Sequence, residues 1–144
     1  MPDIPANAVS PIPFLHLQGA NGISLTGSKC LECGAVSSGE RTVCAACTAR
    51  GRMQPIELSK HGKLYNFSVV YRSFPGVKTP FVTAIVDLDG GGTLKGTLID
   101  VTPDPKALAF DMPVDVVIRD TGQKDPDGRP FVSYYFVPSQ GAQR

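Results

Sequence analysis

A chain of 144 residues is long enough for one ordinary domain or two very small ones, which argues against a single large enzyme domain. The chain has fourteen Lys and Arg residues and thirteen Asp and Glu residues. Its formal net charge of +1 gives no overall field that would attract nucleic acid or anionic lipid. No apolar run reaches the roughly 18 to 20 residues of a membrane span, and no export signal is recognisable before Phe14. We therefore expect a soluble, cytoplasmic protein without a membrane partner.

Residues 1–22 are expected to form an extended N-terminal arm. The segment contains four prolines, and the stretch PFLHLQGANGISL is too interrupted by glycine for a stable helix. Such an arm is either disordered or held against another surface, and in the second case Phe14, Leu15 and Leu17 would be its anchors.

All four cysteines lie in the next segment, residues 23–52, as two C-x-x-C pairs separated by ten residues. They are Cys30, Cys33, Cys44 and Cys47. This is the spacing of two knuckles that present four thiolates tetrahedrally to one metal ion. Gly34 supplies backbone freedom after the first pair, and Thr48 takes that place after the second. We expect a zinc ribbon with a closed, structural site, because four cysteines leave no open position for substrate.

Two alternatives to zinc are open. Disulfides compete, but a chain without an export signal stays in a reducing compartment, and disulfides do not require the paired spacing. Iron also accepts four thiolates, although nothing else in the sequence indicates electron transfer.

The second half of the chain alternates as short β-strands separated by turns. The strands are expected over residues 63–72, 80–89, 93–101, 113–120 and 130–138. DGGGT at 89–93 predicts a tight hairpin, and PDPKALAF at 103–110 predicts one short helix capped by Asp104. Five strands with a helical turn between the third and fourth have the layout of an OB-fold barrel. We place the barrel over residues 53–138 and a flexible tail over 139–144.

Several stretches together resemble one known family. They are LTGSKCLECG (25–34), RTVCAAC (41–47), HGKLYNFSVVYRSFPGVKTPFV (61–82) and FDMPVDVVIRD (110–120). Along nearly the whole chain they are similar to the rubredoxin-like zinc ribbon plus OB-fold proteins catalogued as domain of unknown function thirty-five. The resemblance implies a mainly β protein that is a small accessory subunit of an acyl-CoA enzyme, chiefly a thiolase or related acyltransferase and sometimes an enoyl-CoA hydratase.

The chain departs from the pattern of this family in one place. Members often carry P-P-R before the third cysteine, whereas this chain has SGER at 38–41, which keeps Arg41. The loop between the knuckles is therefore expected to be more mobile or to contact a different surface. Metal binding should be unaffected, because all four thiols are present.

Catalysis by this chain alone is not expected. A nucleophilic mechanism needs a thiol or hydroxyl beside a base, and a metal would occupy all four cysteines. The two histidines, His16 and His61, lie in no recognisable catalytic motif. The resemblance implies that the reactive cysteine and its acid–base partners come from a thiolase-like catalytic subunit in a hetero-oligomer.

A coenzyme A ester is the ligand that the two subunits would share. Cationic side chains would bind its phosphates, and an apolar surface would contact its acyl group. The candidates for contact with substrate, coenzyme A or partner are Arg50, Arg52, Lys60, His61, Lys63, Arg72, Phe74 and Lys78. For each cation the alternative is an ordinary solvated charge, and for His61 a turn residue. Phe74, at a Pro-Gly turn, would close over a bulky acyl group, plug into a partner or cap the barrel end.

Two rival functions are weighed against the accessory role. OB-folds and zinc ribbons often bind single-stranded nucleic acid through stacked aromatics and a basic groove. The balanced charge argues against this, and the stripe of Tyr65, Phe67, Val69 and Tyr71 is expected to be chiefly core by its period of two. The other rival is a pure scaffold that bridges two acyl-CoA enzymes without touching substrate.

Overall fold

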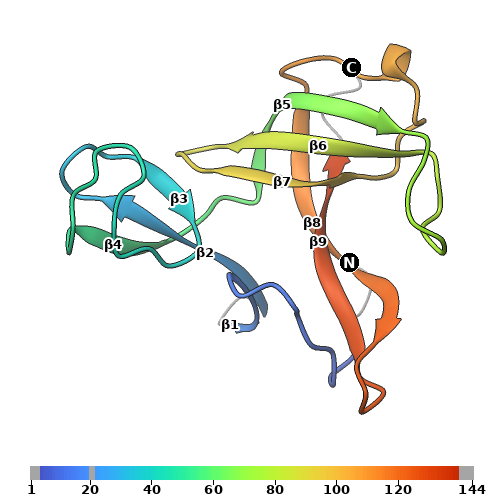
Figure 1. Cartoon of the computed structure of the whole chain (residues 1–144), viewed down its shortest axis with the longest axis horizontal. Coiled ribbons are helices and arrows are strands. Elements are labelled where there is room, and N and C mark those ends of the chain that lie inside the picture. The colour runs from blue at the N-terminus through green and yellow to red at the C-terminus, as the bar shows by residue number, and fades with distance from the viewer. Residues whose placement is uncertain (1–3, 20–21, 140–144) are drawn as a thin grey trace. The chain divides into compact units, whose positions relative to one another are not determined.

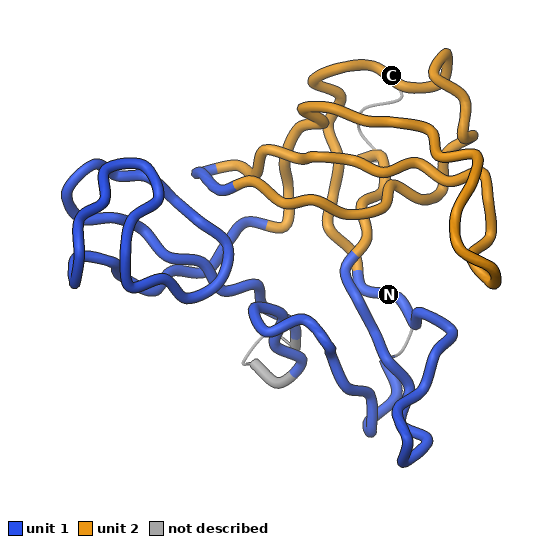
Figure 2. The backbone as a smooth tube through the Cα atoms, in the orientation of Figure 1, with its two compact units in different colours: residues 1–59, 90–92, 118–134 blue, residues 60–89, 93–117, 135–144 orange. Residues whose placement is uncertain are grey.

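Strands form most of the regular structure of the chain, of which the computed structural model describes residues 4–19 and 22–139 (Figure 1). The mainly β class is therefore confirmed. The chain divides into two compact units (Figure 2). The first unit comprises residues 1–59, 90–92 and 118–134, and the second comprises 60–89, 93–117 and 135–144. The boundaries expected at residues 22, 52 and 138 stay predictions.

The first unit contains a four-stranded sheet that is built around β2. Its strands are β1 (Leu15–Gly19), β2 (Gly22–Cys30), β3 (Val36–Ser38) and β4 (Met53–Glu57). The first half of β2 pairs with β1, and its second half pairs with β3 and β4, all antiparallel. Part of the expected arm is thus a strand, because Leu15 pairs with Leu25 and both side chains are buried.

The chain before β1 is held against another segment of the same unit. The N–H of Val9 donates to the carbonyl of Pro130 at 3.0 Å, and the N–H of Val132 donates to the carbonyl of Val9 at 3.0 Å. The Phe14 ring lies 5.8 Å from the Tyr134 ring. Of the two states expected for the arm, its described part therefore adopts the held one. The arm residues 1–3 and 20–21 lie outside the described residues.

The five strands expected in the second half of the chain form a closed barrel in the order β5-β6-β7-β9-β8. They are β5 (His61–Val70), β6 (Phe81–Leu88), β7 (Thr93–Leu98), β8 (Pro113–Lys124) and β9 (Pro130–Pro138). The neighbours β7 and β9 pair in parallel, with Leu98 opposite Phe136. Along β6 every second side chain is buried, from Val82 to Leu88, so this strand lines the core by its period of two.

A β-bulge in β5 overturns one expectation from the sequence. Leu64 pairs with Val86, but the next paired residue is Asn66, opposite Ile85, so one extra residue enters the strand. The alternation changes phase there, and Tyr65 is 61% exposed instead of pointing into the core. The predicted core stripe is wrong at Tyr65 and also at Tyr71, which follows the strand and is 64% exposed. Its other members, Phe67 and Val69, pair with the buried Ala84 and Val82.

The turns of the barrel follow the sequence. Gly90, Gly91 and Gly92 connect β6 and β7 with φ values of 82°, 115° and 93°, as the DGGGT stretch predicts. The expected short helix is a 3-10 turn over Pro105–Ala107, and Asp104 caps it by accepting a 2.9 Å hydrogen bond from the N–H of Lys106.

The expected tail begins at Ser139, whose N–H donates to the carbonyl of Pro113 at 3.1 Å. The rest of that tail, residues 140–144, lies outside the described residues. Within the described part of the chain, no helix has the length and apolar composition needed to cross a membrane.

Candidate metal centre

The four cysteines lie in two knuckles of nearly identical backbone geometry. In the first knuckle, the N–H of Gly34 donates to the carbonyl of Cys30 at 2.9 Å; in the second, the N–H of Thr48 donates to the carbonyl of Cys44 at 2.9 Å. Residues Gly34 and Thr48 have φ values of 79° and 65°. The sequence predicts this left-handed position for the glycine, and the structure extends it to the threonine.

The sulfur atoms of the two knuckles converge on one point. All four lie within 4.8 Å of one another, and the pairs Cys30–Cys47 and Cys33–Cys44 are each 3.6 Å apart. A tetrahedral zinc ion with Zn–S bonds of about 2.3 Å places its sulfurs about 3.8 Å apart, so the cluster has the size of such a site. Cys30 and Cys44 are buried, whereas Cys33 and Cys47 are exposed, and all four are free thiols.

The electrostatics of the cluster favour a bound cation. The backbone N–H of Cys47, followed by that of Ala46, lowers the pKa of the Cys44 thiol to about 6. The backbone N–H of Cys33 lowers the pKa of Cys30 in the same way. At Cys47 the N–H of Ala49 lowers the pKa, but the thiol of Cys33, burial and the other two cysteines outweigh it and raise the pKa to about 12. A thiolate at Cys47 therefore needs a positive charge beside it, which a metal ion supplies.

Ser28 fixes the loop between the knuckles, a role that no sequence motif predicts. Its side chain is buried, its Oγ donates to the carbonyl of Gly39 at 2.7 Å, and it accepts from the N–H of Arg41 at 3.1 Å. The only signal in the sequence is a polar residue two positions before Cys30 in a strand. Whether the SGER loop is more mobile than its counterparts stays a prediction.

The eight candidate contact residues are divided between the two units. Arg50 and Arg52 belong to the first unit, and the other six belong to the second. Arg52 forms a 2.7 Å ion pair with Glu32, so its positive charge is partly neutralised within the chain. His61 and Lys63 are exposed at the start of β5, whereas Arg72, Phe74 and Lys78 are exposed in the loop that follows it. The last candidate, Lys60, is half-buried, and its carbonyl accepts from the N–H of Val116.

His61 takes part in a contact that the sequence does not reveal. Its Nδ1 lies 2.7 Å from Oδ1 of Asp115, which also accepts a 2.7 Å hydrogen bond from Oγ of Ser139. The carboxylate lies between the serine and the histidine, whereas a nucleophilic triad places the imidazole in the middle. The contact ties the residue after β9 to β5 and β8.

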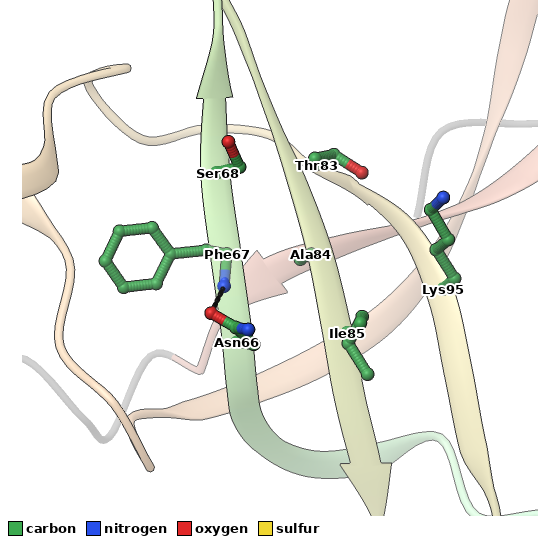
Figure 3. Close-up of a pocket in the computed structure, with 7 residues that line it drawn as sticks. All are labelled: Asn66, Phe67, Ser68, Thr83, Ala84, Ile85 and Lys95. Carbon is green, nitrogen blue, oxygen red and sulfur yellow. Dashed lines mark hydrogen bonds between the residues drawn. The ribbon is translucent and has the colours of Figure 1, made fainter.

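A shallow hollow of about 200 Å³ lies on β5, β6 and β7 (Figure 3). Asn66, Ser68, Thr83 and Lys95 contribute polar groups to its lining, and the Phe67 ring points away from Lys95. None of these polar residues is distinguished in the sequence, because each is an ordinary outward position of a strand.

Comparisons with known proteins agree with this architecture. Residues 55–119 match the family described as ChsH2, C-terminal OB-fold domain. The chain is 32% identical over 115 residues to a DUF35 domain-containing scaffold protein of Methanothermobacter thermautotrophicus, covering 78% of this chain and 84% of the relative. The chain therefore belongs to the DUF35 family, as the motifs of the sequence indicate.

Two further proteins extend the comparison. The chain is 29% identical over 112 residues to the benzoylsuccinyl-CoA thiolase subunit BbsA of Thauera aromatica, which covers 78% of this chain and 74% of the subunit. A solved structure described as the Ltp2-ChsH2(DUF35) aldolase has a TM-score of 0.62 and 22% identity, covering 81% of this chain and 85% of its own. At that identity the likeness establishes the shared fold.

Proposed function

We propose that this chain is a non-catalytic, zinc-binding accessory subunit of an acyl-CoA thiolase complex, with a benzoylsuccinyl-CoA thiolase of anaerobic toluene degradation as the particular complex to test first. One observation carries the proposal: the similarity to the thiolase subunit BbsA extends over 112 residues, 78% of the chain, which is more than the barrel alone comprises. The chain would stabilise its catalytic partner and help to form the site for the coenzyme A ester.

Zinc is the metal that we assign to the four cysteines. Cys30, Cys33, Cys44 and Cys47 would hold it, and a four-thiolate shell leaves no position for substrate or water. When bound, the ion supplies folding free energy to a ribbon that is too small to build its own core. Elemental analysis distinguishes iron from zinc, and an iron–thiolate site would also absorb visible light.

Contact with the coenzyme A ester is the finer part of the proposal. Phosphate groups are bound by Lys and Arg through charge-assisted hydrogen bonds. The exposed cations Lys63 in the second unit and Arg50 in the first are the residues that we propose for this contact. Arg52 is a weaker candidate, because Glu32 already pairs with it.

A pure scaffold that bridges two acyl-CoA enzymes is the second candidate function. It is favoured by the description of the relative from Methanothermobacter thermautotrophicus as a scaffold protein. The two candidates differ in a measurable way. A subunit that helps to form the substrate site changes the KM of its partner for the acyl-CoA, whereas a bridge leaves that KM unchanged and adds a second enzyme to the complex.

The deciding experiment is isolation of the tagged full chain from its native cells, with mass spectrometry of the companion chains and metal analysis of the complex. We expect a thiolase-like companion in a fixed ratio, one zinc ion per chain, and thiolase activity that the isolated chain lacks. Absence of any acyl-CoA enzyme among the companions contradicts the proposal. Salt-sensitive binding to a single-stranded oligonucleotide would instead favour the nucleic-acid alternative.

A further inference from the structure

Exposed large hydrophobic side chains are concentrated in the loop between β5 and β6. Six large hydrophobic side chains are exposed among the described residues, and three of the six belong to one seven-residue stretch. They are Tyr71, Phe74 and Val77 in that stretch, with Leu31, Tyr65 and Phe110 elsewhere. Single exposed hydrophobic residues are normal in soluble proteins, but a cluster of this kind marks an interaction site.

The backbone of the loop holds the cluster in a defined shape. The N–H of Val77 donates to the carbonyl of Phe74 at 3.1 Å, which closes a four-residue turn with Pro75 and Gly76 in the middle. Proline followed by a glycine at φ 89° is the pattern of a type II turn. Phe74 and Val77 therefore stand at the two ends of a turn whose conformation is set before any partner binds, and a preorganised turn loses less entropy on binding.

Phe74 differs from the other exposed phenylalanine in its surroundings. Phe110 is exposed but lies 5.4 Å from the Phe67 ring, so the chain itself accounts for its position. Phe74 is 83% exposed and has no ring contact among the described residues. Of the three alternatives for Phe74, capping of the barrel end does not fit this exposure, because a cap would bury the ring.

The charged residues of the loop itself are of one sign. From Tyr71 to Val86 the chain carries Arg72 and Lys78 and no acidic residue. Neither of the two cations forms an ion pair with any residue that the structure describes. An apolar tip between two available cations is complementary to an apolar pocket that has carboxylates at its rim.

We propose that residues 72–78, the Phe74 turn, dock onto a partner protein, with Phe74 and Val77 entering an apolar pocket and Arg72 and Lys78 pairing with Asp or Glu side chains at its rim. This inference rests on the proposed accessory role and specifies its contact. Phe74 is then the anchor of a protein interface and not a wall for the acyl group of the substrate. Exposed aromatic anchors of this kind are typical binding hot spots.

Photo-crosslinking in native cells tests the contact directly. A benzophenone amino acid replaces Phe74 in the full chain, and the same amino acid replaces Phe110 as the matched control. We expect an adduct with a protein chain at position 74 and none at 110, and the linked peptide should line an apolar pocket next to Asp or Glu. An adduct with an acyl-CoA or a lipid at position 74, or no adduct at all, overturns the proposal.

Affinity measurements on the purified complex give a second readout. We expect Phe74→Ala to raise the Kd for the companion chain about thirtyfold, the loss typical of a hot spot, and Phe110→Ala to leave it unchanged. Reversing both charges with Arg72→Glu and Lys78→Glu should weaken binding and invert its dependence on salt, because added salt would then screen a repulsion. Equal losses for Phe74→Ala and Phe110→Ala would contradict the assignment of the anchor.

The outcomes also separate this inference from the proposed function. If position 74 links to an enzyme that does not act on acyl-CoA, the thiolase role fails and the docking turn stands. If a thiolase-like chain co-purifies but binds Phe74→Ala as tightly as the unchanged chain, the docking turn fails and the thiolase role stands.

Discussion

Thr48 occupies a backbone conformation that its own side chain disfavours. A β-branched residue in the left-handed region costs about 1–2 kcal/mol, and Gly34 occupies the matching position of the first knuckle without that cost. We expect Thr48→Gly to raise the free energy of unfolding of the metal-loaded protein by about 1 kcal/mol, because the flexibility of glycine offsets part of the gain. Thermal unfolding measures the difference.

The reverse substitution is the matched control for this prediction. Gly34→Thr should lower the free energy of unfolding, since it introduces the strain that Thr48→Gly removes. A loss of stability in Thr48→Gly would instead assign the larger effect to the hydroxyl of Thr48, which donates to the carbonyl of Cys47 at 2.6 Å.

Asp125 organises the turn between β8 and β9. Its carboxylate accepts hydrogen bonds from the N–H of Asp127 at 3.0 Å, and from the N–H and Nε of Arg129 at 2.7 and 2.6 Å. Burial raises the pKa of Asp125, but the backbone N–H and then the guanidinium of Arg129 outweigh it and hold the pKa below its usual value.

The direction of this pKa shift determines how the contribution of Asp125 to stability depends on pH. A carboxyl group whose pKa is lower in the folded state stabilises the protein above its unfolded pKa of about 3.9, and this contribution is lost as the pH falls through the folded pKa. Asp125→Asn should therefore lower the melting temperature at neutral pH, and the difference from the unchanged protein should shrink below about pH 4. Asp127→Asn is the control, because its carboxylate is 81% exposed and 3.8 Å from Arg129. A deficit for Asp125→Asn that is constant with pH would contradict the electrostatic cause.

At the scale of elements, the β6–β7 hairpin depends on more than a flexible turn. A Cβ at Gly91 would lie 2.9 Å from Cγ2 of Val36, and the φ of Gly91 is 115°. A side chain there meets both backbone strain and a packed neighbour, so Gly91→Ala should lower the free energy of unfolding by about 2 kcal/mol or more.

The adjacent glycine separates the two causes. Gly90 has a φ of 82° but open space around the added Cβ, so Gly90→Ala should cost only the conformational part, about 1 kcal/mol. Urea unfolding of both variants measures the difference. Equal losses would show that the contact with Val36 contributes nothing.

The sequence predicts the elements well where the signal is local. The strand β6 is predicted because its apolar residues alternate without interruption, and the glycines after Asp89 mark the hairpin. The errors occur where distant pairing decides the outcome. Nothing near Tyr65 signals the bulge, and β1 forms because Leu15 pairs with Leu25 and both side chains are buried.

The candidate site likewise has features that the sequence predicts and features that it does not. The positions of the four sulfurs are predicted by spacing alone, because a C-x-x-C knuckle fixes its own geometry. The support from Ser28 and the link between His61 and Asp115 join residues far apart in the chain, and no spacing rule identifies them.

At the scale of the whole molecule, we expect the proposed metal and the barrel to contribute separately to stability. The ribbon would depend on the ion, whereas the barrel has a buried core of its own in residues such as Val82, Val86 and Leu94. We expect chelation to raise amide hydrogen exchange sharply over residues 30–50 and to leave the amides of β6 protected. Mass spectrometry after exchange measures both regions in one sample.

Cysteine substitution provides the matched variant for this prediction. Cys30→Ser or Cys44→Ser should lose the metal and the partner together, with the exchange pattern of the chelated protein. Full metal content with intact association in these variants would contradict a structural role for the site. Loss of protection from hydrogen exchange throughout the barrel would instead show that the chain unfolds as one cooperative unit.

The hydrogen bonds of Val9 with Pro130 and Val132 join the two ends of the described chain within one unit. A ribosome delivers Val9 first and Pro130 more than a hundred residues later. The first unit therefore cannot be completed during synthesis until residues 118–134 have emerged, even though its cysteines are available early to capture an ion.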